Sequence, residues 1–161
     1  MYRILLGGLV AMSMTTSAGV EKPLEVLGES VIIRVSGKET GDELSVVEIV
    51  TPPGLGAPAH ANTREIIIFF VAEGTVTFTA EGDSVEQQAG AVVMIPRGVM
   101  HTCTITGDKP SRLIATFAPG GFDRFLMELY ERAFVMPDDM PAFVQLAADY
   151  GVEIPAPQVD H

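Results

Sequence analysis

Short apolar runs, rich in β-branched residues and each ended by Gly, Pro or Asp, fill the chain from residue 20 to residue 119. Runs of this length between turn residues are typical of β-strands. The pattern predicts strands at 31–35, 44–50, 65–72, 75–80, 84–88, 91–95, 101–106 and 111–117. Many short strands with closely spaced turns favour a mainly β fold, either a sandwich or a barrel.

The spacing of apolar residues changes to that of helices after residue 121. A first amphipathic helix is predicted from Phe122, Phe125, Leu126, Leu129 and Tyr130, which recur at intervals of three and four. A second helix is predicted to begin at Asp139, with Pro141 in its first turn, and to end at Gly151. It would carry Phe143, Leu146 and Tyr150 on one side. We expect both helices to cover an edge or a face of the β fold.

These patterns divide the chain into a β domain at 21–119, a helical segment at 120–151 and a loose tail at 152–161, whose terminal His161 is given no role. Residues 1–20 allow two interpretations. An apolar stretch at 4–12 followed by small and polar residues has the order of a short secretory signal peptide. The alternative is an N-terminal β-strand. The location therefore stays open between the cytoplasm and, if residues 1–18 are cleaved, secretion.

The charge of the chain narrows the classes of partner. Lys and Arg number 10 against 21 Asp and Glu, which gives a formal net charge of −11. Such a surface repels phosphate backbones and anionic lipid headgroups, so we expect neither nucleic acid nor a membrane as partner. The one cysteine, Cys103, excludes an intrachain disulfide. A hydrophobic content of 47% is enough to fill one core.

Two histidines lie beside Gly and Pro at regular spacings. Gly54 stands six positions before His60, and Gly74 follows; a second set comprises Gly90, Pro96, Gly98 and His101. These positions resemble the two motifs of the cupin family over roughly residues 24–118. The resemblance implies a double-stranded β-helix, a jelly-roll-like barrel, with C-terminal helices similar to those of small quercetinase-like cupins.

The same resemblance implies a metal site from which ligands are missing. In metal-binding cupins, two histidines and a glutamate of the first motif converge with one histidine of the second. Here Asn62 replaces the second histidine, Ile67 replaces the glutamate, and Ile105 replaces a final asparagine. His60 and His101 remain. Two imidazoles without a carboxylate bind a dication less well than mixed ligand sets do. We therefore expect one weakly held divalent ion (Fe, Mn, Ni or Zn) or a metal-free site.

Three side chains are candidate replacement ligands. The Asn62 amide oxygen would be a weak ligand. Glu65 lies two residues before Ile67, so a regular strand puts both on one face. Glu48 interrupts an apolar strand. The ordinary interpretation places Glu65 at the solvated mouth of the barrel and Glu48 on its outer face.

The strands also predict the walls of a pocket. Ile67, Phe69, Val71, Met94 and Ile105 are expected to line the interior with apolar surface, which suits a hydrophobic or aromatic ligand. Cys103 follows His101 by two residues and should face the same way. Its thiol is either a soft ligand or nucleophile, or a small buried hydrophobe, which we favour.

Two functions are compatible with these residues. The first is an enzyme acting on an apolar or aromatic metabolite. With a metal it would be dioxygenase-like; without one it would be an isomerase or cyclase using His60 and His101 as general acid and base. The alternative is a non-catalytic binding protein that has lost its metal site. The fold alone does not decide between them. The resemblance further implies a homodimer.

Overall fold

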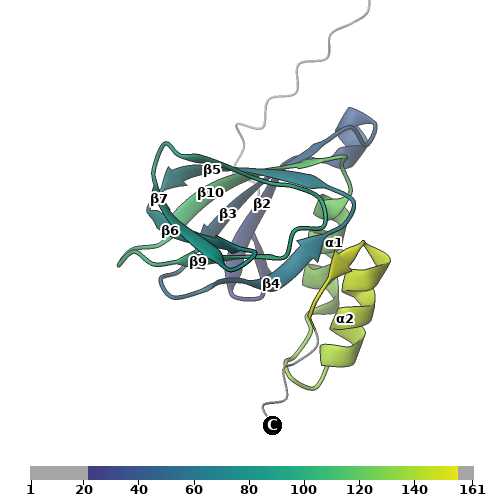
Figure 1. Ribbon diagram of the computed structural model, residues 1–161. Coiled ribbons are helices and arrows are strands. Elements are labelled where there is room, and N and C mark those ends of the chain that lie inside the picture. Colours follow the sequence, from purple (N-terminus) through teal and green to yellow (C-terminus); the bar gives the residue numbers. More distant parts are fainter. Residues whose placement is uncertain (1–21, 156–161) are drawn as a thin grey trace, which may run out of the picture.

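The computed structural model describes residues 22–155 (Figure 1). The predicted signal peptide or N-terminal strand lies outside the described residues, as do His161 and the last part of the predicted tail. None of the helices in residues 22–155 is long and apolar enough to cross a membrane.

Eleven strands and two α-helices make up the described part of the chain. The strands are β1 Leu24–Val26, β2 Glu29–Val35, β3 Ser45–Thr51, β4 Gly56–Asn62, β5 Ile66–Glu73, β6 Thr75–Ala80, β7 Asp83–Gln88, β8 Val92–Ile95, β9 His101–Ile105, β10 Ser111–Ala118 and β11 Val152–Glu153. A 3-10 turn, Gly37–Thr40, joins β2 to β3. The eight predicted strands are confirmed to within about two residues at each end.

The strands form two antiparallel sheets that face each other as the walls of a barrel (Figure 1). One sheet has the order β1-β2-β3-β10-β5-β8, and the other has the order β11-β4-β9-β6-β7. Alternate residues of each strand point inward. In β10, for example, Leu113, Ala115 and Phe117 are buried. The mainly β fold predicted from the sequence, a jelly-roll-like barrel, is therefore confirmed.

The apolar pattern did not predict strand β4, and the pairing of this strand is irregular. Its pairing with β9 shifts register between Ala57 and His60. Gly56 has a φ of 155°, and a Cβ there would lie 1.7 Å from the carbonyl oxygen of Cys103. Only glycine allows the two backbones to approach this closely. The close approach holds β4 against β9 just before it carries His60.

Strand β11 lies within the segment that we predicted to be a loose tail. Val152 pairs with Asn62, and Glu153 pairs with Ala61. The Gly151 carbonyl also accepts hydrogen bonds from the Thr63 amide and hydroxyl, each at 2.8 Å. The prediction is therefore wrong for residues 152 and 153, which extend the sheet of β4.

The two helices begin and end close to the predicted residues. Helix α1 spans Phe122–Arg132 and α2 spans Met140–Asp149, with Asp139 and Tyr150 at its caps. Figure 1 shows α1 beside one end of the barrel and α2 beyond it. Tyr130 does not share the buried face of α1, because it is 40% exposed.

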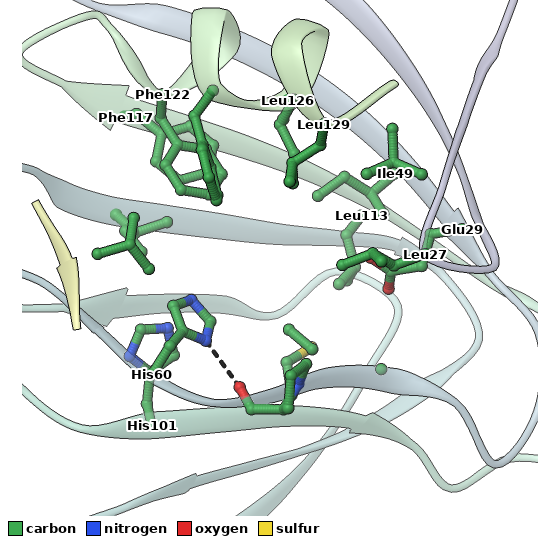
Figure 2. Close-up of a pocket in the computed structure, with 18 of the residues that line it drawn as sticks. Leu27, Glu29, Ile49, His60, His101, Leu113, Phe117, Phe122, Leu126 and Leu129 are labelled. Carbon is green, nitrogen blue, oxygen red and sulfur yellow. Dashed lines mark hydrogen bonds between the residues drawn. The ribbon is translucent and has the colours of Figure 1, made fainter. Parts of the chain in front are cut away.

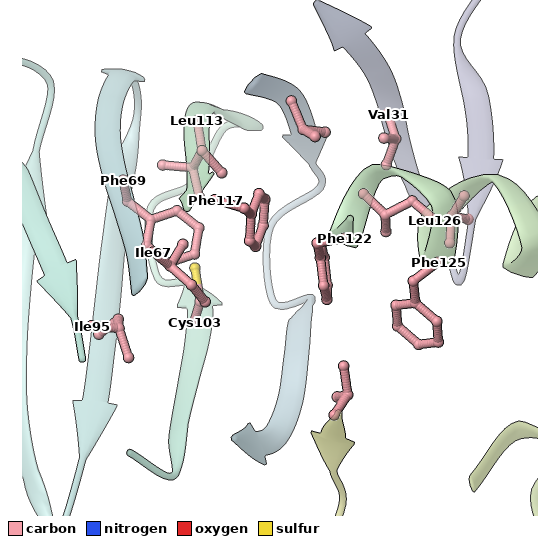
Figure 3. Packing of buried hydrophobic residues seen from close by; sticks show 14 of the residues in the cluster. Val31, Ile67, Phe69, Ile95, Cys103, Leu113, Phe117, Phe122, Phe125 and Leu126 are labelled. Atoms are coloured by element: carbon pink, nitrogen blue, oxygen red, sulfur yellow. The ribbon is translucent and has the colours of Figure 1, made fainter. Parts of the chain in front are cut away.

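Buried aromatic residues join α1 to the barrel. Phe122 of α1 stacks on Phe117 of β10, with ring centroids 4.2 Å apart (Figure 3). The buried carboxylate of Asp123 accepts hydrogen bonds from the Gly37 amide at 3.0 Å and the Gly121 amide at 3.1 Å. These bonds fix the start of α1 to the connection between β2 and β3. One end of the barrel interior is therefore closed by the helix.

Candidate functional site

A cavity of about 140 Å³ lies in the barrel where it meets α1 (Figure 2). Its lining is mostly apolar. Aromatic rings contribute much of this surface, and they come from both the barrel and the helices: Phe69, Phe117, Phe122, Phe125 and Phe143. The polar and thiol side chains in the lining are Glu29, His60, His101 and Cys103. A small apolar cavity with few polar groups is typical of a site for a small molecule.

His60 and His101 lie side by side in the wall of this cavity. They are paired residues of the neighbouring strands β4 and β9, and their ring centroids are 4.4 Å apart. His60 Nδ1 donates a hydrogen bond to the Pro58 carbonyl at 2.8 Å, and His101 Nδ1 donates one to the Val99 carbonyl at 2.9 Å. Because a carbonyl oxygen only accepts, each ring carries its proton on Nδ1 and keeps the Nε2 lone pair.

Burial favours the neutral form of both rings. It lowers the pKa of His60 to about 4, with the nearby His101 adding to this and the bond to Pro58 opposing it. Burial also lowers the pKa of His101. The Nε2 atom of His101 is buried and has no hydrogen-bond partner within residues 22–155. Near neutral pH the site therefore holds two uncharged imidazoles, and the Nε2 atom of His60 is the more accessible of the two proton acceptors.

Comparisons with known proteins agree with this architecture. Residues 47–117 match the family described as the cupin domain. An RmlC-like cupin from Shewanella frigidimarina has 24% identity and a TM-score of 0.58, over 70% of this chain and 96% of its own. Over residues 47–117 this chain is therefore similar to the cupin domain. No curated protein matches the sequence.

Two further structures resemble the cupin domain in fold. A predicted oxalate decarboxylase from Thermotoga maritima has 19% identity and a TM-score of 0.60, over 66% of this chain and 99% of its own. The polyketide cyclase RemF from Streptomyces resistomycificus has 19% identity and a TM-score of 0.51, over 62% of this chain and 70% of its own. At these identities the likeness concerns the fold.

The residues around His60 and His101 do not fit the metal site expected of a metal-binding cupin. Ile67 lines the cavity and is 1% exposed, so an apolar side chain occupies the position of the glutamate. No group of three or more His, Cys, Asp or Glu side chains that could hold a metal ion occurs within residues 22–155. Two imidazoles then lack the anionic ligand that usually accompanies them.

The proposed replacement ligands lie away from the cavity. Asn62 and Glu65 are 1% and 3% exposed, and neither lines the cavity. Glu65 is thus not at a solvated mouth, and that prediction is wrong. Its burial raises the pKa of the Glu65 carboxyl, an effect that the neighbouring Asn62 amide opposes. Glu48 lies on the outer face, as expected, where it forms ion pairs with Arg34 and Arg112.

Three of the predicted wall residues line the cavity, namely Ile67, Phe69 and Cys103. Val71 and Ile105 are buried in the core but do not line it. The prediction for Met94 is wrong, because its side chain is 58% exposed. Met94 pairs with Ile68 on the outer face of β5 and β8. Residues two apart share a face of a strand, so Ile95 rather than Met94 points inward.

Cys103 behaves as a buried hydrophobe. Burial raises the pKa of its thiol to about 12, and the charge of Glu29 adds to this effect. The reactive form of cysteine is the thiolate. A thiol in this environment is protonated at neutral pH and is a poor nucleophile.

Glu29 is the polar cavity residue that the sequence analysis missed. It is the first residue of β2, and its Oε1 accepts a hydrogen bond from the Thr51 hydroxyl at 2.7 Å. Burial raises the pKa of its carboxyl, an effect that this bond opposes. The sequence signal that could have identified Glu29 was its spacing. Glu29 lies two residues before the apolar Val31 and therefore shares its face of the strand. Strand 31–35 was predicted to begin just after it.

Proposed function

We propose that the protein is a small-molecule cupin enzyme that transfers protons on an apolar or aromatic molecule with His60 and His101. The observation that carries this proposal is the pair of neutral imidazoles in the wall of a mostly apolar cavity. Each ring keeps an Nε2 lone pair, because its Nδ1 is bound to a backbone carbonyl. Such a ring can act as a general base.

The chemistry that suits this pair is isomerisation or cyclisation through an enolate. One imidazole Nε2 removes a proton from a carbon next to a carbonyl group, and the electron pair moves to the carbonyl oxygen. The resulting imidazolium returns the proton at another atom, so no oxidant or reductant is consumed. The short distance between the rings disfavours two positive charges. The pair therefore carries one proton at a time, as a shuttle requires.

The fold of a polyketide cyclase supports this proposal. RemF, a polyketide cyclase, has a similar barrel, and a cyclisation is one of the reactions that a neutral imidazole pair could promote. A metal-dependent, dioxygenase-like reaction has less support, since Ile67 replaces the carboxylate that would complete the ligand set. The alternative is a non-catalytic binding cupin, which the loss of those ligands favours.

Proton exchange in D₂O tests the proposal without knowledge of the natural substrate. The chelator-treated full chain would be incubated with one-ring aromatic ketones, and deuterium uptake next to the carbonyl followed by NMR. We expect uptake with the parent protein and a large loss in His60→Gln and His101→Gln. Val85→Gln, a change at an exposed position of β7, is the matched control.

The other outcomes of this experiment separate the alternatives. Binding of the ketones without any deuterium uptake would favour the non-catalytic binding protein. Uptake or oxygen consumption that appears only after Fe or Mn is added would favour the dioxygenase-like form. Equal uptake in the parent and in both histidine variants would contradict the proposed role of the pair.

We also propose that the protein forms a homodimer through the outer face of β5 and β8. Four apolar side chains are exposed there in cross-strand pairs, Ile68 with Met94 and Phe70 with Val92. Strand β8 is the edge of its sheet, so its outer backbone groups can pair with another strand. A second copy carries the same negative charge and would be repelled elsewhere, but these four residues are uncharged. Light scattering should give twice the chain mass, and Phe70→Glu should give the monomer.

A further inference from the structure

A second polar group lies in the cavity, at a distance from the histidines. Figure 2 shows Glu29 beside Leu27 at one end of the cavity and the two imidazoles at the other. Glu29 comes from the six-stranded sheet, whereas His60 and His101 come from the five-stranded sheet. The cavity therefore presents polar atoms at both ends of an apolar chamber.

The contacts of Glu29 leave one carboxyl oxygen available. Thr51, which is 1% exposed, donates to Oε1 at 2.7 Å and fixes the orientation of the carboxyl group. Within residues 22–155, no side chain or backbone amide donates a hydrogen bond to Oε2, and no Lys or Arg lines the cavity. Oε2 is not one of the fully buried polar atoms of residues 22–155, so a small molecule can reach it. Glu29 is thus positioned by the protein but not neutralised by it.

The lining limits the ligand by charge. An anionic group would meet Glu29 and two uncharged imidazoles, with no cation to bind it. A hydroxyl or amino group can instead donate a hydrogen bond to the free oxygen of Glu29. The polar end of the ligand is therefore a donor rather than a carboxylate or phosphate.

The cavity also limits the ligand by size and shape. Its volume is about 140 Å³, and an apolar cavity of roughly 150 Å³ holds one benzene ring. Five phenylalanine rings contribute to the lining, and aromatic rings pack well against one another in offset or tilted arrangements. A one-ring aromatic molecule fits both properties.

We propose that Glu29 is a specificity-determining residue, which accepts a hydrogen bond from a hydroxyl or amino group on a one-ring aromatic ligand. Binding at Glu29 directs the opposite end of the ring toward His60 and His101. This second step rests on the proposed function, whereas the binding step does not. Thr51 is a positioning residue, since it acts through Glu29.

Binding measurements with matched ligands test the proposal. Calorimetry would compare 4-ethylphenol and benzylamine, which carry a donor, with ethylbenzene, which lacks one, and with benzoate, which is anionic. We expect the parent protein to bind a donor ligand about 10-fold to 100-fold more tightly than ethylbenzene, the range typical of a hydrogen bond to a charged group. Tighter binding of benzylamine would indicate a charged Glu29, and tighter binding of 4-ethylphenol would indicate a neutral hydroxyl as the natural donor. Both support the proposal.

Variants locate the effect at Glu29. Glu29→Leu should abolish the preference for the donor ligand while keeping or improving the affinity for ethylbenzene, which also shows that the cavity is folded. Thr51→Val should reduce the preference in part. Glu25→Leu, an exposed position on the neighbouring strand β1, is the control and should keep it. Equal binding of ethylbenzene and the donor ligands to the parent, tighter binding of benzoate, or a full preference in Glu29→Leu would overturn the proposal.

The histidine variants separate this inference from the proposed function. His60→Gln and His101→Gln should keep the donor preference, because Glu29 is intact. One outcome is that the parent prefers donor ligands while neither it nor any variant exchanges protons. In that case the proposed reaction fails and the role of Glu29 stands. If proton exchange depends on the histidines but the preference is absent, the role of Glu29 fails and the proposed reaction stands.

Discussion

The two ends of the cavity respond to the same environment in opposite ways. Loss of water lowers the pKa of His60 and His101, and it raises the pKa of Glu29. In each case burial disfavours the charged form. At the histidine end, however, the result is two free lone pairs, because the Nδ1 protons are already bound to carbonyl groups. At the other end the result is the Glu29 carboxyl group, which accepts a hydrogen bond from Thr51. The histidine end therefore suits proton transfer, and the Glu29 end suits the binding of a hydrogen-bond donor.

The largest effect expected concerns the histidine end. Removal of a general base typically costs a factor of about 10² to 10⁴ in rate. Because the proposed reaction passes one proton through the pair of His60 and His101, we expect each Gln variant to lose nearly as much proton exchange as the double variant. The measurement is the rate of deuterium uptake by NMR. Independent, additive losses would mean that the two rings act separately. The histidine end of the cavity would then not work as a pair.

A carboxylate introduced beside the histidines should restore metal binding. Ile67→Glu places a third ligand in the cavity wall, and a buried charge without a partner costs several kcal/mol, on the order of 3–5. We expect the metal-free variant to melt well below the parent, and added Ni or Mn to raise its Tm. Val85→Glu is the control, since this position of β7 is 47% exposed and lies outside the proposed dimer face.

Calorimetric scans with and without metal decide this prediction. A variant at position 67 that melts like the parent and ignores the metal would mean that the histidines cannot share a ligand with this position. A similar rise in Tm for Val85→Glu would show that the metal binds the outer surface.

The pKa of His60 predicts how stability depends on pH. The folded protein binds the proton of His60 only below a pH of about 4, whereas the unfolded chain binds it below about 6.5. Between these values the unfolded state holds more protons, so stability falls as the pH drops. The largest difference is on the order of 2–3 kcal/mol, from roughly 2.5 pKa units at 1.36 kcal/mol each, discounted for partial exposure.

Comparison with His60→Gln isolates this contribution. The raised pKa values of Glu29 and Glu65 act in the opposite direction and are present in both proteins. Urea unfolding at several pH values between 4 and 7 should show the parent losing stability relative to His60→Gln as the pH falls. Parallel curves would mean that His60 titrates as freely in the folded protein as in the unfolded chain.

The smallest effect is expected between the two ends, at Cys103. A protonated thiol that packs as a hydrophobe contributes through its contacts alone, so Cys103→Ala should lower the free energy of unfolding by about 1 kcal/mol. The rate of proton exchange by the Cys103→Ala variant should fall far less than that of the histidine variants. Denaturant unfolding and NMR check both values. A loss of exchange comparable with that of His60→Gln would restore the thiol as a reacting group.

The fold could be predicted largely because most strands and both helices carry a periodic apolar pattern. Strand β4 escaped this pattern, since Gly56–Asn62 contains Ala, Pro and Gly rather than β-branched residues. It is stabilised by its pairing with β9 and β11. Strand β11 has only two residues, and so short a segment has no periodicity to detect. Both depend on tertiary contacts.

The site could be predicted in part. The spacing of His60 and His101 from Gly and Pro identified the two residues that lie together. The sequence of β8, Val-Val-Met-Ile, is apolar on both faces, so alternation could not show that Met94 points outward. Glu29 was missed because a single polar residue at the start of an apolar strand is indistinguishable from a turn residue. Its carboxyl group is held by Thr51, which lies 22 residues later in the sequence.

Strand β11 has a consequence for the order of events during synthesis. The strand that carries His60 is an unpaired edge until residues 152 and 153 dock on Asn62 and Ala61. A chain made from its N-terminus can pair β4 with β9 early, but the ribosome must release nearly the whole domain before the last strand is in place. Because an edge strand can pair with a foreign chain, the nascent protein is exposed to misassembly in that interval. We therefore expect chains truncated before residue 152 to keep β4 as an open edge and to aggregate.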